Sequence, residues 1–471
     1  MNKSDTIAAI STAMNNSGIG IVRMSGSESF RILEKIFKPA KKKNIKDISS
    51  HTIHYGNIMD GDKAVDEVLV MIMKAPHTYT REDTVEIDCH GGMYVLKKTL
   101  ELLIKNGART AEPGEFTKRA FLNGRIDLSQ AEAVIDIINA QNDFALKSAL
   151  SQLKGSVSEK IRQMRAALLE QIAYIEAALD DPEHIEMEGY GQTLLPIVNS
   201  LIKDIDKLIE SADDGRILKE GINTVILGKP NAGKSSLLNA LLGSERAIVT
   251  DIAGTTRDTL EESIRIKDIT LNVYDTAGIR ETDDLIEKIG VDKALEYAQS
   301  ADLIVWLADA SRYLDEDDCQ IMALLRKKKV ICLLNKQDLD IKLTREDLEL
   351  HLKAFGFHDA SAENGIFPII EISAKENTGL DKFTETVREM FYSKQINFND
   401  QLYITNVRQK ESLIDARESL IKAAQSIECG MPEDFFTIDM MDGYTSLGSI
   451  IGEAVEDDLA DEIFAKFCMG K

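Results

Sequence analysis

A glycine-rich segment has the residue types and spacing of a phosphate-binding loop. Gly228–Ser236 matches the pattern G-x-x-x-x-G-K-S, follows the apolar run 224–227 and opens a predicted helix at Ser236. Glycines let backbone N–H groups curve around a phosphate, and the start of a helix adds positive potential. Lys234 would neutralise the β- and γ-phosphate oxygens, and the Ser235 hydroxyl would bind Mg²⁺. The segment therefore predicts a nucleoside triphosphate site.

Two further motifs have the chemistry to complete the phosphate end of this site. Asp275–Gly278 follows the next apolar run, where its carboxylate can reach the metal through water and the Gly278 N–H can approach the γ-phosphate. Thr255 and Thr256 supply a second hydroxyl for Mg²⁺.

Two motifs later in the chain point to guanine as the base. Asn335–Asp338 follows an apolar run, and the Asp338 carboxylate can accept hydrogen bonds from the N1–H and amino group of guanine. Adenine would leave this carboxylate unpaired, which such a site penalises strongly. Ser373–Lys375 follows the last apolar run and would support the contact. GTP is thus the expected nucleotide.

The group that assists hydrolysis is not evident from these motifs. Ile279 follows Asp275–Gly278 and cannot orient water as glutamine does in Ras-type GTPases. The transition state also needs positive charge near the bridge between the β- and γ-phosphates. Either an arginine, Arg257 or Arg280, or a monovalent cation bound by Asn231 and loop carbonyls could supply it.

The elements that must position these motifs alternate between apolar strands and helices from Ile222 to about Phe391, which predicts a parallel, doubly wound sheet. A small α/β pattern covers about 19–121. Between Leu146 and Leu179 apolar residues recur about every 3.67 residues, which predicts one long, nearly straight helix. An i, i+4 apolar row from Leu447 to Phe467 predicts another. The two helical segments would pack together as one domain into which the second α/β unit is inserted.

Composition indicates a globular protein of several domains. The 471 residues include 8 Pro and 29 Gly, and the formal charge is −23. No stretch approaches the ~18 apolar residues of a membrane helix, so a cytoplasmic protein is expected. Five scattered cysteines favour free thiols over disulfides or zinc. The acidic balance disfavours diffuse binding to nucleic acid. The basic runs at 41–43, 118–125 and 326–329 are expected to be solvated surface rather than RNA contacts.

The order of the motifs resembles the MnmE (TrmE) family of tRNA modification GTPases. Thr250–Asp258, Asp275–Glu281 and the chain end Phe467–Lys471 carry the resemblance together with the phosphate loop. The same family pattern continues near the N-terminus, at Gly18–Gly26, Cys89–Gly92 and Pro113–Asn123. The resemblance covers the whole chain. Its GTPase motifs fit many relatives, whereas the two ends are far more specific.

The resemblance implies an α/β plus all-α architecture. An N-terminal folate-binding and dimerisation domain is expected at 1–122, a helical domain in two parts at 123–217 and 392–471, and an inserted Ras-like P-loop GTPase domain at 218–391. Such proteins form homodimers and act with an MnmG-type partner that uses FAD and NADH, in a heterotetramer or larger complex. Together they add an aminomethyl or carboxymethylaminomethyl group to C5 of the wobble uridine, position 34, of certain tRNAs. The cofactor implied is a tetrahydrofolate derivative, 5,10-methylene- or 5-formyl-tetrahydrofolate, and a methylene-bearing one is the expected one-carbon source.

The resemblance also assigns residues. K⁺ would bind Asn231, Thr250, Ile252 and Thr255 in place of an arginine finger when two GTPase domains meet, Mg²⁺ would bind Ser235 and Thr256, and Glu287 would position the attacking water. Folate contacts fall on Arg23, Glu86, Arg125 and Lys471, and Cys468 would act near the one-carbon unit. The full set expected to bind GTP is Asn231, Ala232, Gly233, Lys234, Ser235, Ser236, Thr250, Asp251, Ile252, Ala253, Gly254, Thr255, Thr256, Asp275, Thr276, Ala277, Gly278, Asn335, Lys336, Asp338, Ser373, Ala374 and Lys375.

Each of these residues could also have an ordinary structural role. Glu287 would otherwise be an exposed helix residue, the folate residues surface ion-pair formers, and Cys468 a spare thiol. Many family members have lysine where Arg125 stands, and isoleucine where Met469 stands. The alternative function is an Era-type ribosome-assembly GTPase, which a KH segment with G-x-x-G would favour and which is not evident here. The GTPase part of an iron transporter is disfavoured because the sequence has no membrane helix.

Overall fold

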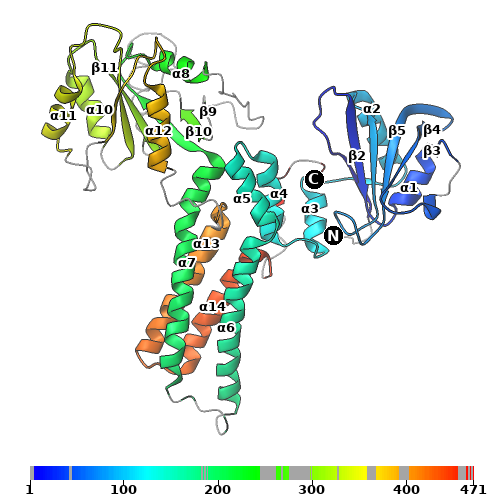
Figure 1. Ribbon diagram of the computed structural model, residues 1–471. Coiled ribbons are helices and arrows are strands. Elements are labelled where there is room, and N and C mark those ends of the chain that lie inside the picture. Colours follow the sequence, from blue (N-terminus) through cyan, green and yellow to red (C-terminus); the bar gives the residue numbers. More distant parts are fainter. Residues whose placement is uncertain are drawn as a thin grey trace, which may run out of the picture. The chain divides into compact units, whose positions relative to one another are not determined.

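The structure is a computed structural model (Figure 1). It describes residues 5–41, 45–181, 184, 187, 189–243, 261–266, 269–274, 297–298, 300–325, 328–357, 367–391, 403–453, 463–464, 467 and 470. The chain divides into one compact unit of Met1–Asn139, Ala149–Asp206 and Glu411–Lys471, and a second of Ala140–Ser148 and Lys207–Lys410. None of the helices in these ranges is both long and apolar enough to cross a membrane.

The N-terminal part of the first unit is a sheet in the order β3-β4-β5-β6-β2-β1-β7. Neighbouring strands of this sheet are antiparallel, except that β1 and β7 are parallel. Side chains of β1 alternate between the two faces, because successive strand residues point to opposite sides. Ala8 and Ile10 pack with α1 and α2, whereas Ile7 and Ala9 pack with Phe116 of α3. The elements are β1 Ile7–Ile10, β2 Ile19–Ser25, α1 Ser29–Ile36, β3 Phe37–Pro39, the 3₁₀ helix η1 Ile45–Asp47, β4 Thr52–Asp60, β5 Lys63–Met73, β6 Thr84–His90, α2 Met93–Lys105, β7 Arg109–Thr110 and α3 Glu115–Leu122.

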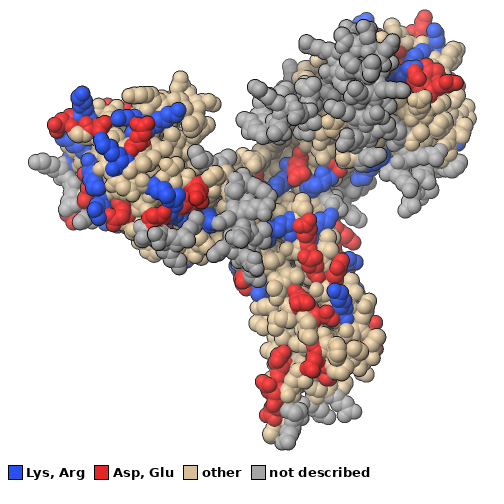
Figure 2. All heavy atoms as spheres, turned by 180° about the vertical axis from the view of Figure 1, so that it is seen from behind, with Lys and Arg blue, Asp and Glu red and all other residues tan. Residues whose placement is uncertain are grey.

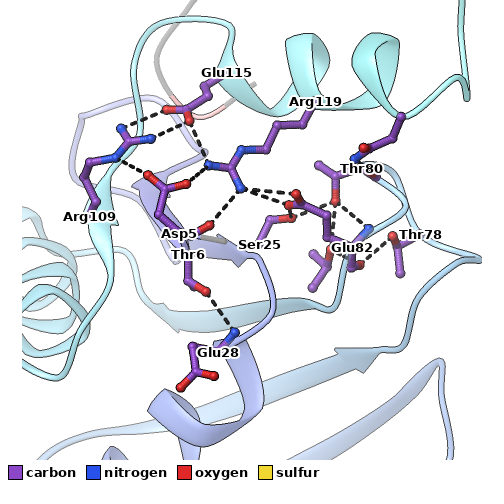
Figure 3. A network of polar contacts seen from close by, with 12 residues as sticks. Asp5, Thr6, Ser25, Glu28, Thr78, Thr80, Glu82, Arg109, Glu115 and Arg119 are labelled. Carbon is purple, nitrogen blue, oxygen red and sulfur yellow. Dashed lines mark hydrogen bonds and ion pairs between the residues drawn. The ribbon is translucent and has the colours of Figure 1, made fainter. Parts of the chain in front are cut away.

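A buried ionic network holds α3 on this sheet (Figure 3). Glu115 Oε1 accepts from Arg109 Nη2 at 2.6 Å and from Arg119 Nη2 at 2.9 Å, and its side chain is 0% exposed. Arg119 also donates to Asp5 Oδ1 at 2.7 Å and to Glu82 at 3.2 Å. Each buried charge is therefore paired with charges from other segments. The expectation of a solvated run at 118–125 is wrong for Lys118 and Arg119, each only 8% exposed, because these carboxylates draw Arg119 inward.

The helical part of the first unit contains α6 packed along α14 (Figure 1). Arg165 of α6 lies over the Tyr444 ring at 4.1 Å and donates to the Tyr444 carbonyl. A side chain at Gly448 would meet the Arg165 guanidinium at 3.1 Å, so glycine permits this close approach. The helices of this part that lie wholly in the first unit are α4 Leu128–Asn139, α6 Ser156–Asp180 and α14 Glu433–Ile451. Three more helices are divided between the two units: α5 Asp143–Leu153, α7 Tyr190–Glu220 and α13 Val407–Glu428.

The prediction of one long helix from Leu146 to Leu179 is wrong in part. The chain breaks at Gly155, whose φ of +94° is left-handed and leaves the helical region. The apolar spacing continues across this break, and for that reason the sequence predicted one helix where there are two. Within α6 the predicted stripe is buried, from Val157 to Ile175, whereas Leu146 and Leu150 of α5 are 38% and 40% exposed.

The prediction of a continuous C-terminal helix is also wrong. Gly452 ends α14 with a φ of +86°, so the row that begins at Leu447 and Ile451 does not continue on the same helix. Val455 and Leu459 lie outside the described residues. Phe464 and Phe467 instead pack with Phe121 and Leu128, as a separate cluster.

The second unit contains a sheet in the order β13-β12-β11-β8-β10-β9. All its pairs are parallel except that of β10 with the edge strand β9, which the sequence analysis did not predict. Along β11, Val305 packs with α8 and α12 whereas Trp306 packs with α10 and α11, so both faces of the sheet are covered. The elements are β8 Ile222–Leu227, α8 Lys234–Leu242, β9 Glu261–Ile266, β10 Ile269–Tyr274, β11 Leu303–Asp309, α10 Glu316–Leu324, β12 Val330–Asn335, α11 Arg345–Ala354, β13 Ile369–Glu371 and α12 Leu380–Phe391.

Loss of the Glu115 charge should destabilise the N-terminal sheet. Glu115→Gln leaves Arg109 and Arg119 facing an amide, and we expect a loss of about 3 kcal/mol in the free energy of unfolding. Urea unfolding followed by far-UV circular dichroism measures this. Trp306 is the only tryptophan and lies in the second unit, so its fluorescence should report an unchanged transition there.

The effect should disappear in acid. Burial opposes ionisation of Glu115, but hydrogen bonds from Arg109 and the Glu112 amide outweigh it and lower its pKa below the ordinary 4.5. A lowered pKa stabilises the fold above that value, and the stabilisation is lost as pH falls through the folded-state pKa. The difference between wild type and Glu115→Gln should therefore shrink below about pH 4. Glu112→Gln, at an exposed neighbouring position, is the control; an equal effect there would contradict the network's role.

Candidate functional site

Three of the motifs that sequence analysis singled out lie at one edge of the sheet in the second unit. β8, β11, β12 and β13 are parallel, so their carboxyl ends lie at the same edge. The loop 228–233 follows β8, Asn335 ends β12, and Ser373 follows β13. Topology thus brings together segments that lie more than a hundred residues apart in the chain.

The Asn335 side chain joins two of these loops to the end of β12. Its Nδ2 donates to the Ala232 carbonyl at 2.8 Å, and its Oδ1 accepts from the Ala374 N–H at 3.0 Å. Asn335 is 2% exposed, so both bonds are shielded from water. A side chain on Gly233, which has a φ of +102°, would meet Asn335 Nδ2 at 2.4 Å. Only glycine lets the loop approach so closely.

The loop before α8 has the geometry of an anion-binding turn. Gly233 is the N-cap of α8 and has no side chain to cap the first turn, so N–H groups at this helix start can point to an anion. Asn231 has a φ of +64°, a left-handed conformation that asparagine tolerates. Lys234 Nζ donates to the Gly228 carbonyl at 2.6 Å, which keeps the ammonium over the loop.

Asp338 has the geometry of a hydrogen-bond acceptor at the same edge. Ser373 Oγ donates to Asp338 Oδ1 at 2.7 Å, and the Glu376 N–H donates to Ser373 Oγ at 3.2 Å. The hydrogen bond from Ser373 lowers the pKa of Asp338, to which the nearby charges of Lys375 and Lys336 contribute. Asp338 is therefore a carboxylate at neutral pH and can accept two N–H donors.

Sequence analysis missed a partner of Lys336. Lys336 Nζ donates to Asp309 Oδ2 at 2.7 Å, and the Ser311 hydroxyl donates to Asp309 Oδ1 at 2.6 Å. Although burial opposes ionisation of Asp309, these hydrogen bonds lower its pKa. The signal was present, since Asp309 is a polar residue at the end of an apolar strand, as Asn335 is.

Other predicted residues lie outside the described part of the chain. These are the segment 250–256, the motif 275–278, and the residues Glu287, Cys468 and Lys471, together with the candidate arginines Arg257 and Arg280.

A second group of predicted residues lies in the first unit. Arg23 of β2 donates from Nε to Glu86 Oε1 of β6 at 2.7 Å, since the two residues are directly paired across the sheet. The Arg23 guanidinium lies 5.6 Å from the centre of the Phe116 ring. Phe116 is 0% exposed and comes from α3, which the ionic network of Figure 3 holds in place.

The same apolar cluster extends to Arg125. The Arg125 guanidinium lies over the Tyr79 ring at 4.7 Å, and Nη1 donates to the Tyr79 carbonyl at 3.2 Å. The Tyr79 hydroxyl is hydrogen-bonded to Thr117 of α3 at 2.9 Å, and its ring packs against the cluster that contains Phe116. Arg23 and Arg125 therefore lie on two rings of one cluster. Sequence analysis assigned neither Tyr79 nor Phe116 to the site. Phe116 lies in the motif Pro113–Asn123, which was a signal for it, whereas Tyr79 lies in none of the motifs.

Two family models match the chain. The model described as "GTP-binding protein TrmE N-terminus" matches residues 6–125, and the model described as "MnmE helical domain" matches residues 128–468.

Curated relatives match over the full length. The chain is 53% identical to the tRNA modification GTPase MnmE of Lachnoclostridium phytofermentans, over 100% of both chains. It is 50% identical to the protein of that name from Thermoanaerobacter pseudethanolicus and 49% identical to that from Clostridioides difficile, over 99% of each chain.

Among solved structures, the G domain of the T. maritima FeoB iron transporter is 27% identical, over 36% of this chain and 97% of that chain, with a TM-score of 0.26. Era in complex with MgGDPNP and a 16S ribosomal RNA fragment is 27% identical, over 42% and 66%, with a TM-score of 0.27. The assignment rests on the full-length relatives and the family models. The chain therefore belongs to the MnmE family of tRNA modification GTPases.

Proposed function

We propose that this protein is a K⁺-dependent GTPase, activated by dimerisation, that serves modification of the wobble uridine of certain tRNAs. With an MnmG-type partner carrying FAD and NADH, it would add an aminomethyl or carboxymethylaminomethyl group at C5, with the carbon taken from a tetrahydrofolate. The observation that supports this most is the presence, in one chain of this family, of both the Asn335-centred loop cluster and the Arg23–Glu86 pair.

The second unit would bind GTP at the carboxyl edge of its sheet. Asn231–Ser236 would hold the phosphates, since the loop turns its backbone toward the start of α8 and Lys234 lies over it. Asn335, Lys336 and Asp338 with Ser373–Lys375 would hold the base. The remaining proposed GTP contacts are those at 250–256 and 275–278.

The metal ions would bind at the phosphate end. We propose Ser235 and Thr256 for Mg²⁺, and Asn231 with Thr250, Ile252 and Thr255 for K⁺. Bound there, K⁺ would supply the positive charge that Ras-type enzymes take from an arginine finger. Glu287 would orient the water, since Ile279 cannot.

The first unit would bind the folate beside the Phe116–Tyr79 cluster. Glu86 can accept from the amino and N–H groups of a pterin, while Arg23 and Arg125 can donate to carboxylate or carbonyl oxygens. When bound, the folate supplies the one-carbon unit. Lys471 is proposed as a further contact, and Cys468 as a group that acts near the transferred carbon.

Contact with tRNA must overcome the charge of the chain. The net charge is −23, and on the face shown in Figure 2 acidic side chains run along the helical part, while basic and acidic residues are mixed on the N-terminal part. Phosphate binding by such a surface is weak. We therefore propose that the partner protein supplies much of the affinity for tRNA. The complex would contain homodimers and would act in the cytoplasm.

Asp338→Asn should change the base preference. An amide presents a donor where guanine needs an acceptor, so GTP affinity should fall by roughly 10²-fold and xanthosine triphosphate should bind better than GTP. Competition with a labelled nucleotide measures both. Ser373→Ala is the control, because it removes the hydrogen bond to Asp338 but leaves the carboxylate. Unchanged preference for guanine in Asp338→Asn would contradict the assigned contact.

GTP turnover should depend on the cation. At equal ionic strength we expect turnover in KCl to exceed that in NaCl by roughly tenfold or more, since an equivalent arginine charge is worth ~10³ or more. Asn231→Gly is the matched variant, because glycine adopts the positive φ of Asn231 and only the amide is lost. It should turn over GTP slowly in both salts. Equal wild-type rates in the two salts would reject the cation mechanism.

Folate should bind through the first unit. Titration calorimetry with 5-formyl-tetrahydrofolate should show binding that Arg23→Ala abolishes and Arg125→Lys, which keeps the charge, weakens only slightly. Arg31→Ala is the control, since the side chain of this α1 arginine is 70% exposed. Absence of binding to the wild-type protein would refute the folate assignment.

A further inference from the structure

The carbonyl of Gly470, next to the chain end, lies against the N-terminal sheet. Ser11, which follows β1, donates from Oγ to the Gly470 carbonyl at 3.0 Å. Arg23 donates from Nη1 to the same oxygen at 3.4 Å. Gly470 is buried. One carbonyl from the last residues of the chain therefore contacts two residues near the first.

This contact is close-packed and needs glycine on both sides. Gly470 has a φ of +88°, and a Cβ there would lie 2.4 Å from the Ile10 carbonyl oxygen. Gly114, at the start of α3, has a φ of +68°, and a Cβ there would lie 2.5 Å from the Phe464 carbonyl oxygen. Backbone atoms at such distances cannot yield cheaply, so any larger residue would push the two segments apart.

Two aromatic residues anchor the same segment. Phe464 is 1% exposed and Phe467 is 6% exposed, and both pack with Phe121 and Leu128. We call Phe464, Phe467 and Gly470 the C-terminal anchor. Burial of two phenylalanines is worth several kcal/mol, so the anchor is held firmly against α3 and α4.

The anchor bears directly on Arg23. Glu86 accepts from Nε, Gly470 accepts from Nη1, and the Phe116 ring lies beneath the guanidinium. Nη2 makes no hydrogen bond to any described residue, so its N–H groups remain to meet an oxygen of a bound molecule. A guanidinium held on three sides loses less conformational freedom on binding.

We propose that Ser11 and Gly470 are positioning residues, which act through Arg23 to prepare it for its ligand. The proposal rests on the proposed binding of folate by Arg23. The hydrogen bond from Ser11 holds the Gly470 carbonyl in place, and this carbonyl in turn orients the Arg23 guanidinium. By linkage, a ligand that uses the oriented Arg23 also stabilises the docked anchor.

Four variants of the full chain test this. Ser11→Ala removes one hydroxyl, and Ser11→Thr restores it. Gly470→Ala brings in the Cβ that the Ile10 carbonyl excludes. Gly18→Ala is the matched control, because Gly18 has open space around it and no positive φ.

Two readouts are measured. Calorimetry gives the Kd for 5-formyl-tetrahydrofolate, and hydrogen exchange followed by mass spectrometry gives protection of the peptide 463–471. We expect Ser11→Ala to weaken binding about three- to tenfold and Ser11→Thr to restore it. Gly470→Ala should weaken binding more than about tenfold and speed exchange of the peptide. Added folate should slow that exchange in the wild type, and Gly18→Ala should behave as wild type.

A ligand-independent comparison separates this proposal from the folate assignment. If Arg23 holds Gly470, Arg23→Ala must speed exchange of the peptide 463–471, whereas Arg31→Ala must not. If the wild-type protein binds no folate, the proposed function fails. The exchange rates of Arg23→Ala and Arg31→Ala then test by themselves whether Arg23 holds Gly470. Unchanged exchange in both Gly470→Ala and Arg23→Ala overturns the proposal. Faster exchange in Gly470→Ala with an unchanged folate Kd in a protein that binds folate overturns it as well.

Discussion

The side-chain amide of Asn335 is the interaction on which the nucleotide site depends. Its two hydrogen bonds, to Ala232 and Ala374, join the loop before α8 to the loop after β13. Because Asn335 is buried, neither bond competes with water, and loss of one partner would leave a polar group unpaired. The phosphate loop and the loop that carries Ser373 therefore cannot move independently. Close approach at Gly233 follows from the same amide.

The first unit uses charge in a comparable way. Glu115 and Arg119 pair within a buried network, so α3 has one position on the sheet. That position sets Phe116 beneath Arg23 and Thr117 against Tyr79, which in turn carries Arg125. Partly buried Arg23 and exposed Arg125 thus depend for their positions on residues of α3 that pack beneath them. The motifs Gly18–Gly26 and Pro113–Asn123, which carry the family resemblance, contain Arg23, Phe116 and Thr117, whereas Tyr79 and Arg125 lie outside them.

The elements that sequence analysis predicted correctly share short, self-contained signals. The strands at 224–227, 303–307 and 330–334 are apolar runs, because helices cover both faces of the sheet. β9 was missed since its apolar residues are only two and alternate, Ile264 and Ile266, as on an edge strand rather than in an apolar run. The breaks at Gly155 and Gly452 were missed because apolar spacing alone does not show a left-handed backbone. The expected fold class, an α/β N-terminal domain with a helical domain and a Ras-like domain, is confirmed by the family models and the full-length relatives.

The sequence by itself determined the motif order, the strand ends that carry it, the family and hence the GTPase activity. These follow from patterns within a few residues, in which backbone geometry and side-chain chemistry are set locally. Only the tertiary structure decided which distant groups meet: Asp309 with Lys336, Arg125 with Tyr79, and Ser11 with Gly470, which are 459 residues apart. Such pairs leave no periodic trace in the chain, because their contact depends on how separate elements pack, and packing is a property of the whole fold.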